Sequence, residues 1–271
     1  MEDVGDGDHS SNGSIPASAQ DKAQLIIKDN GIIAGVNMAE RIFDRIDSQI
    51  QFKRLVKDGQ KVAYGEIAFT VEGSARNILK AERLVLNCMQ RMSGIATKTH
   101  ELNALIADTG TKLLDTRKTT PNFRMMEKWA VLIGGGVNHR YGLFDMVMLK
   151  DNHIDYAGGV THAIENVQKY LKEKNLNLKI EVETRTLAEV KEALQATGIH
   201  RIMLDNMSVD MMTEAVKLIN GKVETEASGG TTEKTIRAIA ETGVNYISVG
   251  ALTHSIRSLD MSLKAIPRIS H

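Results

Sequence analysis

The chain has 271 residues, and its 34 Lys and Arg residues balance its 34 Asp and Glu residues. Proteins that bind nucleic acid or a membrane surface through charge usually carry a basic excess, which this chain lacks. Its single cysteine, Cys88, excludes an intrachain disulfide and a cysteine-rich metal site.

No apolar run approaches transmembrane length, so we expect no membrane span. The first residues, MEDVGDGDHSS, are acidic and polar, unlike a signal or transit peptide. Cys88 lies among apolar residues and is expected to be a buried structural thiol. These features predict a cytoplasmic protein.

The first part of the chain predicts a small α+β sheet domain. Residues 1–17 are rich in Gly, Ser and Asp, and we expect them to be loop or extended. A turn at 29–31 separates two short apolar segments, a short helix is expected from Met38 to Ile46, and further strands follow between residues 50 and 71.

Residues 74–96 change to helical periodicity. They predict one long helix, or two helices broken near Ser93-Gly94. Arg83 lies among otherwise apolar positions of this segment. On periodicity alone, it is interpreted as a snorkelling or salt-bridged side chain with Glu82 nearby.

From Lys112 onward, the sequence repeats a strand, a polar or glycine-rich end and a helix or loop. Six such strands can be counted, which is typical of a parallel α/β barrel with its active site at the carboxyl ends of the strands. Because a full barrel has about eight strands, we expect this barrel to be incomplete or open.

The strand ends carry three kinds of group. The cations are Arg117, Lys118, Arg140 and Lys150, with His139 as a further candidate. The acids are Glu181, Glu183 and Asp205, and the backbone donors are Ser228-Gly229-Gly230 and Gly250-Ala251. Glycine turns bind phosphate through backbone N–H groups, and carboxylates hold Mg²⁺ beside a polyphosphate. One pocket is therefore expected to hold a phosphorylated sugar, a magnesium ion and a second anion.

Each of these groups also has a simpler interpretation. Ser228-Gly229-Gly230 could be an ordinary turn, Asp205 could cap a turn, and Glu181 or Glu183 could form a salt bridge inside the barrel. His153 is interpreted as a structural histidine. The functional interpretation rests on the position of all these groups at the same end of successive strands.

Nine segments of the chain resemble the quinolinate phosphoribosyltransferase family. They are EDVGDGDHSS from Glu2, ERLVLNCMQRMSGIATKT from Glu82, DTRKTTPNFRMMEKWAV from Asp115, GGGVNHRYGL from Gly134, KDNHI from Lys150, EVET from Glu181, MLDN from Met203, EASGG from Glu226 and ISVGALTHS from Ile247. The combination of DTRKTTP, GGGxNHR and KDNHI is specific, and the matching segments extend over nearly the whole chain.

The resemblance implies an N-terminal α/β sandwich over residues 1–98 and a barrel over 99–257, with 258–271 packing back on the first domain. It also implies a head-to-tail homodimer. The implied reaction converts quinolinate and phosphoribosyl pyrophosphate to nicotinate mononucleotide, pyrophosphate and CO₂, with Mg²⁺, in NAD biosynthesis.

The resemblance also assigns roles to residues. The positions that match quinolinate-binding residues of the family are Arg83, Thr116, Arg117, Lys118, His139, Arg140 and Lys150. The positions on the phosphoribosyl pyrophosphate side are Lys118, Lys150, Glu183, Asp205, Ser228, Gly229, Gly230, Val249, Gly250 and Ala251. Of these, Glu183 and Asp205 are the metal-side acids, and Lys118, Lys150, Glu183 and Asp205 are the expected catalytic residues. Arg83 is now expected to reach the pocket of the partner subunit, in place of the snorkelling interpretation.

The sequence departs from the family pattern in two places. It begins directly at its ED-G-GD motif, where family members commonly have a preceding helix, and Asn122 occupies a position that is usually glycine. Two rival functions remain open: a Schiff-base aldolase with Lys118 or Lys150 as nucleophile, and a phosphate-ligand sensor that has lost its chemistry.

Overall fold

The computed structural model describes residues 2–267. They form two compact units. The first contains the chain up to His100, Pro121–Gly135 and the segment from Ser255, and the second contains Glu101–Thr120 and Gly136–His254. The mixed α/β architecture confirms the predicted fold class. The boundary at residue 98 stays a prediction, and residues 268–271 of the predicted C-terminal segment lie outside the described residues.

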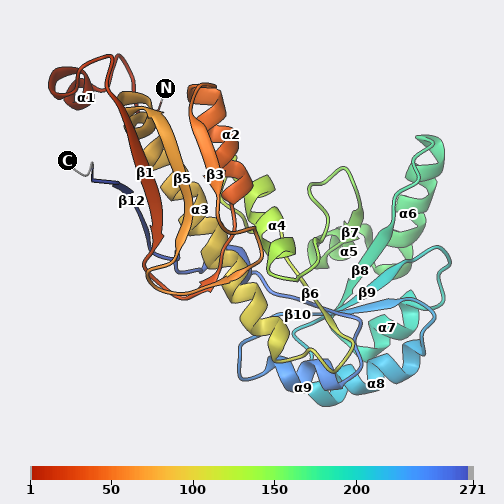
Figure 1. Ribbon diagram of the computed structural model, residues 1–271. Helices are drawn as coiled ribbons and strands as arrows, with labels where there is room; N and C mark the ends of the chain where they lie inside the picture. The colour runs from red at the N-terminus through yellow and green to blue at the C-terminus, as the bar shows by residue number, and fades with distance from the viewer. Residues whose placement is uncertain (1, 268–271) are drawn as a thin grey trace. The chain divides into compact units, whose positions relative to one another are not determined.

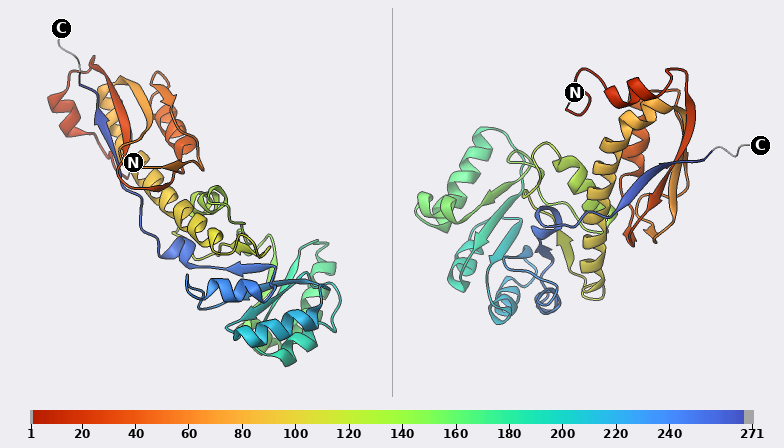
Figure 2. Two further views of the ribbon diagram at one scale, coloured as in Figure 1. Left: turned by 60° about the horizontal axis from the view of Figure 1, so that its bottom comes forward. Right: turned by 90° about the vertical axis from the view of Figure 1, so that its left-hand side faces the viewer.

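A four-stranded antiparallel sheet organises the first unit, with the strand order β12-β1-β5-β3 (Figure 1). The strands are β1 Gln20–Ile27, β3 Gln51–Arg54, β5 Ile67–Ser74 and β12 Met261–Ala265. Figure 2 shows β12 alongside β1, and their register pairs Leu25 with Leu263. The end of the described chain therefore completes the sheet of the N-terminal unit.

Helices pack against one face of this sheet. Alternate residues of β1, including Leu25 and Ile27, are fully buried, which is the period-two pattern of a half-buried strand. They share one hydrophobic core with α2 (Val36–Ile46) and α3 (Ala75–Ala104). The rings of Phe43, Phe52 and Phe69 meet in this core, with centroids 4.5–6.0 Å apart.

The segment from Ala75 to Ala104 is one unbroken helix of 30 residues. The expectation of one long helix is confirmed, and the alternative of a break near Ser93-Gly94 is wrong. Close packing explains why glycine is found at position 94, because a Cβ there would lie only 2.3 Å from the carbonyl oxygen of Arg257. The glycine thus permits a close approach of the C-terminal segment without interrupting the helix. Cys88 on this helix is buried, as expected, and burial raises the pKa of its thiol.

One local prediction in the first unit was wrong. Residues 9–14 form a short helix, α1 (His9–Ser14), and not a loop, because the carboxylate of Asp8 accepts a hydrogen bond from Ser11 N (3.0 Å) and caps it. The sequence did not predict which strands pair beside the 29–31 turn: β2 (Gly31–Ile32) pairs with β4 (Lys61–Val62), while β1 pairs with β5 and β12.

A six-stranded parallel sheet forms the second unit, with the order β6-β11-β10-β9-β8-β7 (Figure 1). The strands are β6 Lys112–Leu114, β7 Val147–Leu149, β8 Ile180–Thr184, β9 Arg201–Asp205, β10 Glu224–Ser228 and β11 Tyr246–Ser248. Within residues 2–267, no strand ladder joins β7 to β6. The predicted incomplete barrel is confirmed.

Helices follow the strands of this unit and cover the sheet. Consecutive helices α6 to α9 pack side by side (Figure 1). The helices are α5 Asp151–Ala157, α6 Val160–Glu173, α7 Leu187–Ala193, α8 Val209–Ile219, α9 Ile236–Glu241 and α10 Ala251–His254. α4 (Arg124–Ile133) belongs to the first unit. None of the helices described over residues 2–267 has the length and hydropathy needed to cross a bilayer.

Candidate active site

The second unit contains a pocket of about 740 Å³ at the carboxyl ends of its parallel strands. This is where α/β proteins bind ligands, because the loops that follow the strands meet at this edge. With the exception of Glu181, all the candidate residues from this unit line the pocket: Thr116, Arg117, Lys118, His139, Arg140, Lys150, Glu183, Asp205, Ser228, Gly229, Gly230, Val249, Gly250 and Ala251. The sequence therefore identified residues that the fold brings together, while their individual roles stay predictions.

The cations of the pocket lie close enough to influence one another. Burial lowers the pKa of Arg140, and the positive charge of Arg117 lowers it further. Arg140 Nη1 donates to the carbonyl oxygen of Met146 (3.2 Å), which holds the guanidinium near β7. Arg140 is partly buried and Arg117 is exposed. Two guanidinium groups that repel each other are suited to a ligand with more than one negative charge.

Lys118 lies against the backbone of the loop that follows β11. A Cβ on Gly250 would lie 3.0 Å from Lys118 Cδ and 3.1 Å from His254 Cδ2. The carbonyl oxygen of Lys118 also accepts a hydrogen bond from Thr253 Oγ1 (2.8 Å). The structure thus joins the loops after β6 and β11 at the pocket.

Two carboxylates face the cations across the pocket. Glu183 Oε2 lies 3.7 Å from Lys150 Nζ, and Glu183 Oε1 accepts a hydrogen bond from Asp151 N (3.3 Å). Burial raises the pKa of Glu183 against the effect of Lys150, and the charge of Asp205 raises it further. Glu183 and Asp205 are therefore close enough to repel each other, and a cation between them would relieve this repulsion.

The glycine loop after β10 packs tightly against the loop after β9. Gly229 and Gly230 have φ angles of +93° and +59°, which favour glycine. A Cβ on Gly229 would lie 2.1 Å from Asn206 Oδ1, and Asn206 N donates to the carbonyl oxygen of Ser228 (2.8 Å). The next helix, α9, begins only at Ile236, so several residues separate the glycines from that helix.

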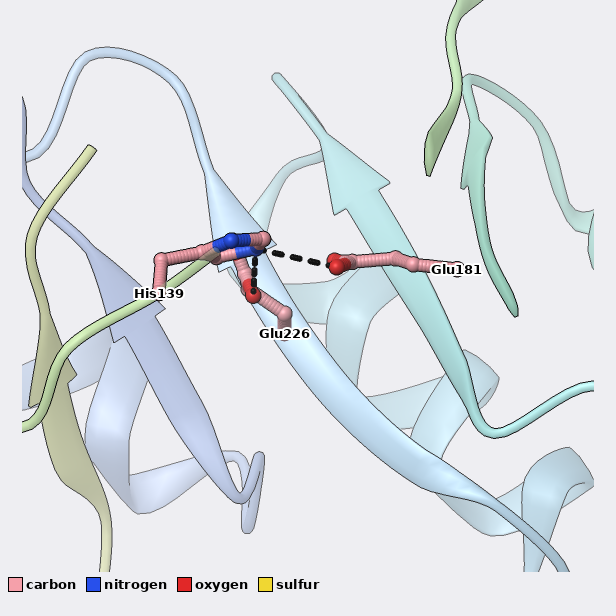
Figure 3. Close-up of side chains that lie close together, drawn as sticks. All are labelled: His139, Glu181 and Glu226. Carbon is pink, nitrogen blue, oxygen red and sulfur yellow. Dashed lines mark ion pairs between the residues drawn. The ribbon is translucent and has the colours of Figure 1, made fainter. Parts of the chain in front are cut away.

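A buried ionic group lies beside the pocket. His139 Nε2 is 2.9 Å from Glu181 Oε2 and 3.3 Å from Glu226 Oε2 (Figure 3). Both carboxylates are fully buried, whereas Glu183 on the same strand as Glu181 lines the pocket. The structure therefore separates two acids that the sequence left equivalent: Glu183 faces the pocket, and Glu181 contacts His139.

Both parts of the chain match known protein families. Residues 8–93 match the family model described as "Quinolinate phosphoribosyl transferase, N-terminal domain", and residues 95–264 match the corresponding C-terminal domain. The chain belongs to the quinolinate phosphoribosyltransferase family.

Related proteins agree with this assignment. The chain is 51% identical over 280 residues to quinolinate phosphoribosyltransferase (decarboxylating) 2a, mitochondrial, of Nicotiana tabacum, covering 97% of this chain and 79% of that protein. It is 50% identical, with the same coverage, to the chloroplastic nicotinate-nucleotide pyrophosphorylase (carboxylating) of Arabidopsis thaliana. The crystal structure of NadC from Streptococcus pyogenes superposes with a TM-score of 0.92 at 39% identity, covering 98% of this chain and 94% of that one.

Sequence reasoning missed several residues of this phosphoribosyltransferase pocket. Asn206, Asp151, Glu226 and His254 also line it. Glu226 could have been found, because it precedes Ser228 by two positions on one strand, as Glu181 precedes Glu183. His153 is structural, as expected: its Nδ1 accepts a hydrogen bond from Lys150 N (3.0 Å) at the start of α5.

Arg83 is exposed on α3, in the first unit of this family member. Its neighbour Leu84 is also exposed, at 49%. An exposed arginine beside an exposed leucine is compatible with a subunit contact. Its contact with quinolinate in a partner subunit stays a prediction.

Proposed function

We propose that this chain transfers the phosphoribosyl group of phosphoribosyl pyrophosphate to quinolinate with decarboxylation. The products are nicotinate mononucleotide, pyrophosphate and CO₂, and the reaction belongs to NAD biosynthesis. The observation that carries the proposal is the convergence of the family's cation, acid and glycine motifs on one pocket at the ends of the parallel strands.

Quinolinate carries two carboxylates, which require closely placed positive charges. Arg117 and Arg140 provide two guanidinium forks that can each bind a carboxylate with two parallel hydrogen bonds. Thr116, His139 and the two lysines complete this side of the pocket. We propose that these residues orient the ring nitrogen of quinolinate toward the ribose.

The glycine loops are proposed to hold the phosphates. Ser228–Gly230 and Val249–Ala251 line the pocket, and the glycines among them let a phosphate approach the backbone. Val249 N donates to Leu114 O (3.0 Å), so the N–H groups proposed to bind phosphate in the second loop are those of Gly250 and Ala251. Glu183 and Asp205 are placed to bind ribose hydroxyls and to stabilise the positive charge that develops on the ribose ring.

The same two acids fit a magnesium ion. Mg²⁺ is commonly bound by one or two carboxylates together with substrate phosphates and water. Glu183 and Asp205 form such a pair, and their mutual repulsion favours a cation. When bound there with the substrate, Mg²⁺ would neutralise charge on the departing pyrophosphate.

We propose the following roles in the two chemical steps. The ring nitrogen of quinolinate attacks the anomeric carbon, the bond to pyrophosphate breaks, and Glu183 or Asp205 stabilises the ribose cation. The alkylated ring then loses the 2-carboxylate as CO₂, and the electron pair left on the ring is stabilised by the pyridinium and by Lys118. The same ring carbon then takes up a proton from solvent, which gives nicotinate mononucleotide. Catalysis is mainly positioning and electrostatics.

We propose that the active form is a homodimer in which Arg83 contacts quinolinate in the partner subunit. Exposed apolar residues beside the predicted interface element, such as Leu84, support this proposal. A cytoplasmic location is also proposed, supported by the buried free thiol of Cys88. The named plant relatives are mitochondrial or chloroplastic, which are alternatives to be tested by imaging of the tagged protein.

Release of labelled CO₂ from 2-carboxyl-labelled quinolinate tests the function. Release that requires both phosphoribosyl pyrophosphate and Mg²⁺ is expected. Ligand binding without CO₂ release would favour the sensor, and borohydride trapping of a carbonyl substrate on Lys118 or Lys150 would favour the aldolase.

A further inference from the structure

An ionic cluster in the interior of the barrel requires an explanation. Glu181 and Glu226 are 0% exposed, and Arg201 is 8% exposed. Side chains in barrel interiors are mostly branched and apolar, and taking charged groups out of water costs several kcal/mol per ion. Hydrophobic residues of similar size would often be at least as stabilising, so stability alone is a poor reason for this cluster.

The cluster is centred on His139, which is held from three sides. Its backbone N–H donates to the fully buried Asp115 Oδ1 (2.8 Å) at the end of β6. Its Nδ1 accepts the backbone N–H of Arg140 (2.6 Å). Its Nε2 lies between Glu181 and Glu226, which come from β8 and β10 (Figure 3). The orientation of the imidazole ring is therefore set by groups from three strands and by the next residue.

Arg201 holds the two carboxylates in place. Its Nη1 lies 2.9 Å from Glu226 Oε2 and 3.8 Å from Glu181 Oε2, while Nε and Nη2 contact Glu224 Oε2 at 3.2 and 2.9 Å. The guanidinium also stacks over the ring of Tyr246 (4.2 Å to the centroid). Since β9 lies between β8 and β10, one arginine reaches acids on both neighbouring strands.

We propose that Glu181 and Glu226 are positioning residues that fix the His139 ring through Nε2 and, through that ring, hold Arg140 at the quinolinate side of the pocket. The expected effect on quinolinate binding rests on the proposed function, whereas the anchoring of His139 can be tested in the protein without substrate. A direct line of contacts runs from Arg201 through the two carboxylates and His139 to the backbone of Arg140, a residue that lines the pocket.

The same three side chains could also be considered for a metal ion. His139, Glu181 and Glu226 offer ligand atoms within 4.8 Å of one another. Arg201 Nη1, however, already lies 2.9 Å from Glu226 Oε2 and supplies a positive charge at this position. A guanidinium at this distance competes with a cation for the same oxygen, so the geometry favours positioning over metal binding.

The ring nitrogens of His139 in the free protein give the first test. In ¹⁵N-labelled wild-type protein, Nε2 is expected to carry a proton at neutral and mildly alkaline pH. Glu181→Gln and Glu226→Gln should each lower the pH midpoint of His139 and let the other tautomer appear. A bare Nε2 in the wild type at neutral pH would overturn the proposal without any variant.

Substrate kinetics give the second test. Glu181→Gln should raise the KM for quinolinate about tenfold, which corresponds to about 1.4 kcal/mol, with little change in the KM for phosphoribosyl pyrophosphate. Glu224→Gln is the matched control, because it removes a carboxylate that contacts the opposite side of Arg201 from Glu226, through Nε and Nη2. It should leave both constants and the ¹⁵N spectrum close to those of the wild type. Equal rises in both KM values, or an unchanged His139 midpoint in Glu181→Gln, would overturn the inference.

Elemental analysis distinguishes the metal alternative. Wild-type protein purified without chelators should contain no stoichiometric transition metal. A bound metal that is lost in Glu181→Gln would overturn the positioning role. If no CO₂ is released by the wild type but its His139 spectrum and the variants behave as stated, the proposed function fails and the anchoring of His139 stands.

Discussion

Gly229 and Asn206 approach each other so closely that no side chain fits between them: a Cβ on Gly229 would lie 2.1 Å from Asn206 Oδ1. The contact joins the loops after β9 and β10, next to Asp205, the proposed metal-side acid at the end of β9, and within the proposed phosphate loop. Gly229→Ala should therefore separate these loops. We expect a KM for phosphoribosyl pyrophosphate raised roughly tenfold or more, since a 1.4 kcal/mol loss has this effect, measured by steady-state kinetics.

Gly221→Ala is the control for this substitution. Gly221 also has a positive φ (+72°), but nothing lies within 4 Å of a Cβ placed there. It should cost about 1 kcal/mol of stability through backbone strain, with no effect on substrate binding. Equal kinetic effects of the two substitutions would show that strain, and not the contact with Asn206, controls the loop.

Lys118→Ala should lower turnover far more than it weakens the binding of phosphoribosyl pyrophosphate. The reason is that Lys118 is proposed to stabilise charge that exists only during decarboxylation. Loss of one such group commonly lowers kcat by roughly a hundredfold or more, which single-turnover CO₂ release would measure. Lys112→Ala, at the exposed first residue of β6 and thus at the end of this strand away from the loop that carries Lys118, should have little effect. Near-normal turnover of Lys118→Ala would remove this residue from the mechanism.

Arg83 and Lys150 should complement each other between subunits. If Arg83 acts in the partner's pocket, a mixed dimer of Arg83→Ala and Lys150→Ala subunits contains one intact site and one doubly defective site. Random mixing of two inactive variants should then restore roughly a quarter of the wild-type activity, because about half of the dimers are mixed and each has one working site. Absence of restored activity in isolated mixed dimers would place Arg83 outside the partner's site.

The sequence predicted most residues of the pocket, because the alternation of strands and helices and the polar residues at the end of each strand can both be read from it. Residues that follow buried strands of a parallel sheet meet at one edge, so Lys150, Glu183 and Asp205 could be grouped without coordinates. Depth within the barrel could not be predicted in the same way. Glu181 and Glu183 share strand parity, and the structure shows that Glu181 is the more deeply buried of the two, at 0% exposure against 8%, with His139 and Arg201 as its partners.

Other features depend on contacts between distant segments. The pairing of β2 with β4 was missed, because a turn signal indicates only that the chain reverses and not which strands then pair. The short helix α1 was missed because its composition is typical of a loop, although Asp8 provides an N-cap. Whether Arg83 contacts the pocket of its own subunit or of a partner likewise depends on how two chains assemble, which one sequence does not show.

Asn122, at the position where the resemblance leads us to expect glycine, has a φ angle of +61°. Asparagine tolerates this left-handed conformation better than most other residues with a side chain, so it can take the place of glycine here. Asn122→Gly should change the free energy of unfolding by less than about 1 kcal/mol, whereas Asn122→Val should lower it by about 1–2 kcal/mol. Chemical denaturation measures both, and equal stability of the three proteins would show that this loop relaxes freely.

His139 should make the stability of the protein depend on pH above neutrality. Burial lowers the pKa of His139, but the ion pairs with Glu181 and Glu226 outweigh it and raise the pKa from 6.5 to about 9. A charged ring carries a proton on Nδ1 as well, so it cannot accept the N–H of Arg140 and is held at Nε2 by two buried carboxylates within 3.3 Å. The hydrogen bond from Arg140 N to Nδ1 belongs to the neutral ring and forms as His139 loses that proton. The folded protein therefore keeps a proton that the unfolded chain releases above pH 6.5.

The sign of the effect follows from this difference. The contribution of His139 is fully present below pH 6.5 and is lost as pH rises toward about 9, so the free energy of unfolding should fall across this range. His139→Gln keeps a polar side chain without this titration, and its stability should change less over the same interval. Thermal unfolding of both proteins at several pH values measures the difference. Parallel pH profiles of the two proteins would mean that His139 is neutral in the folded state, and that the Arg140 N–H, rather than the carboxylates, determines the form of the ring.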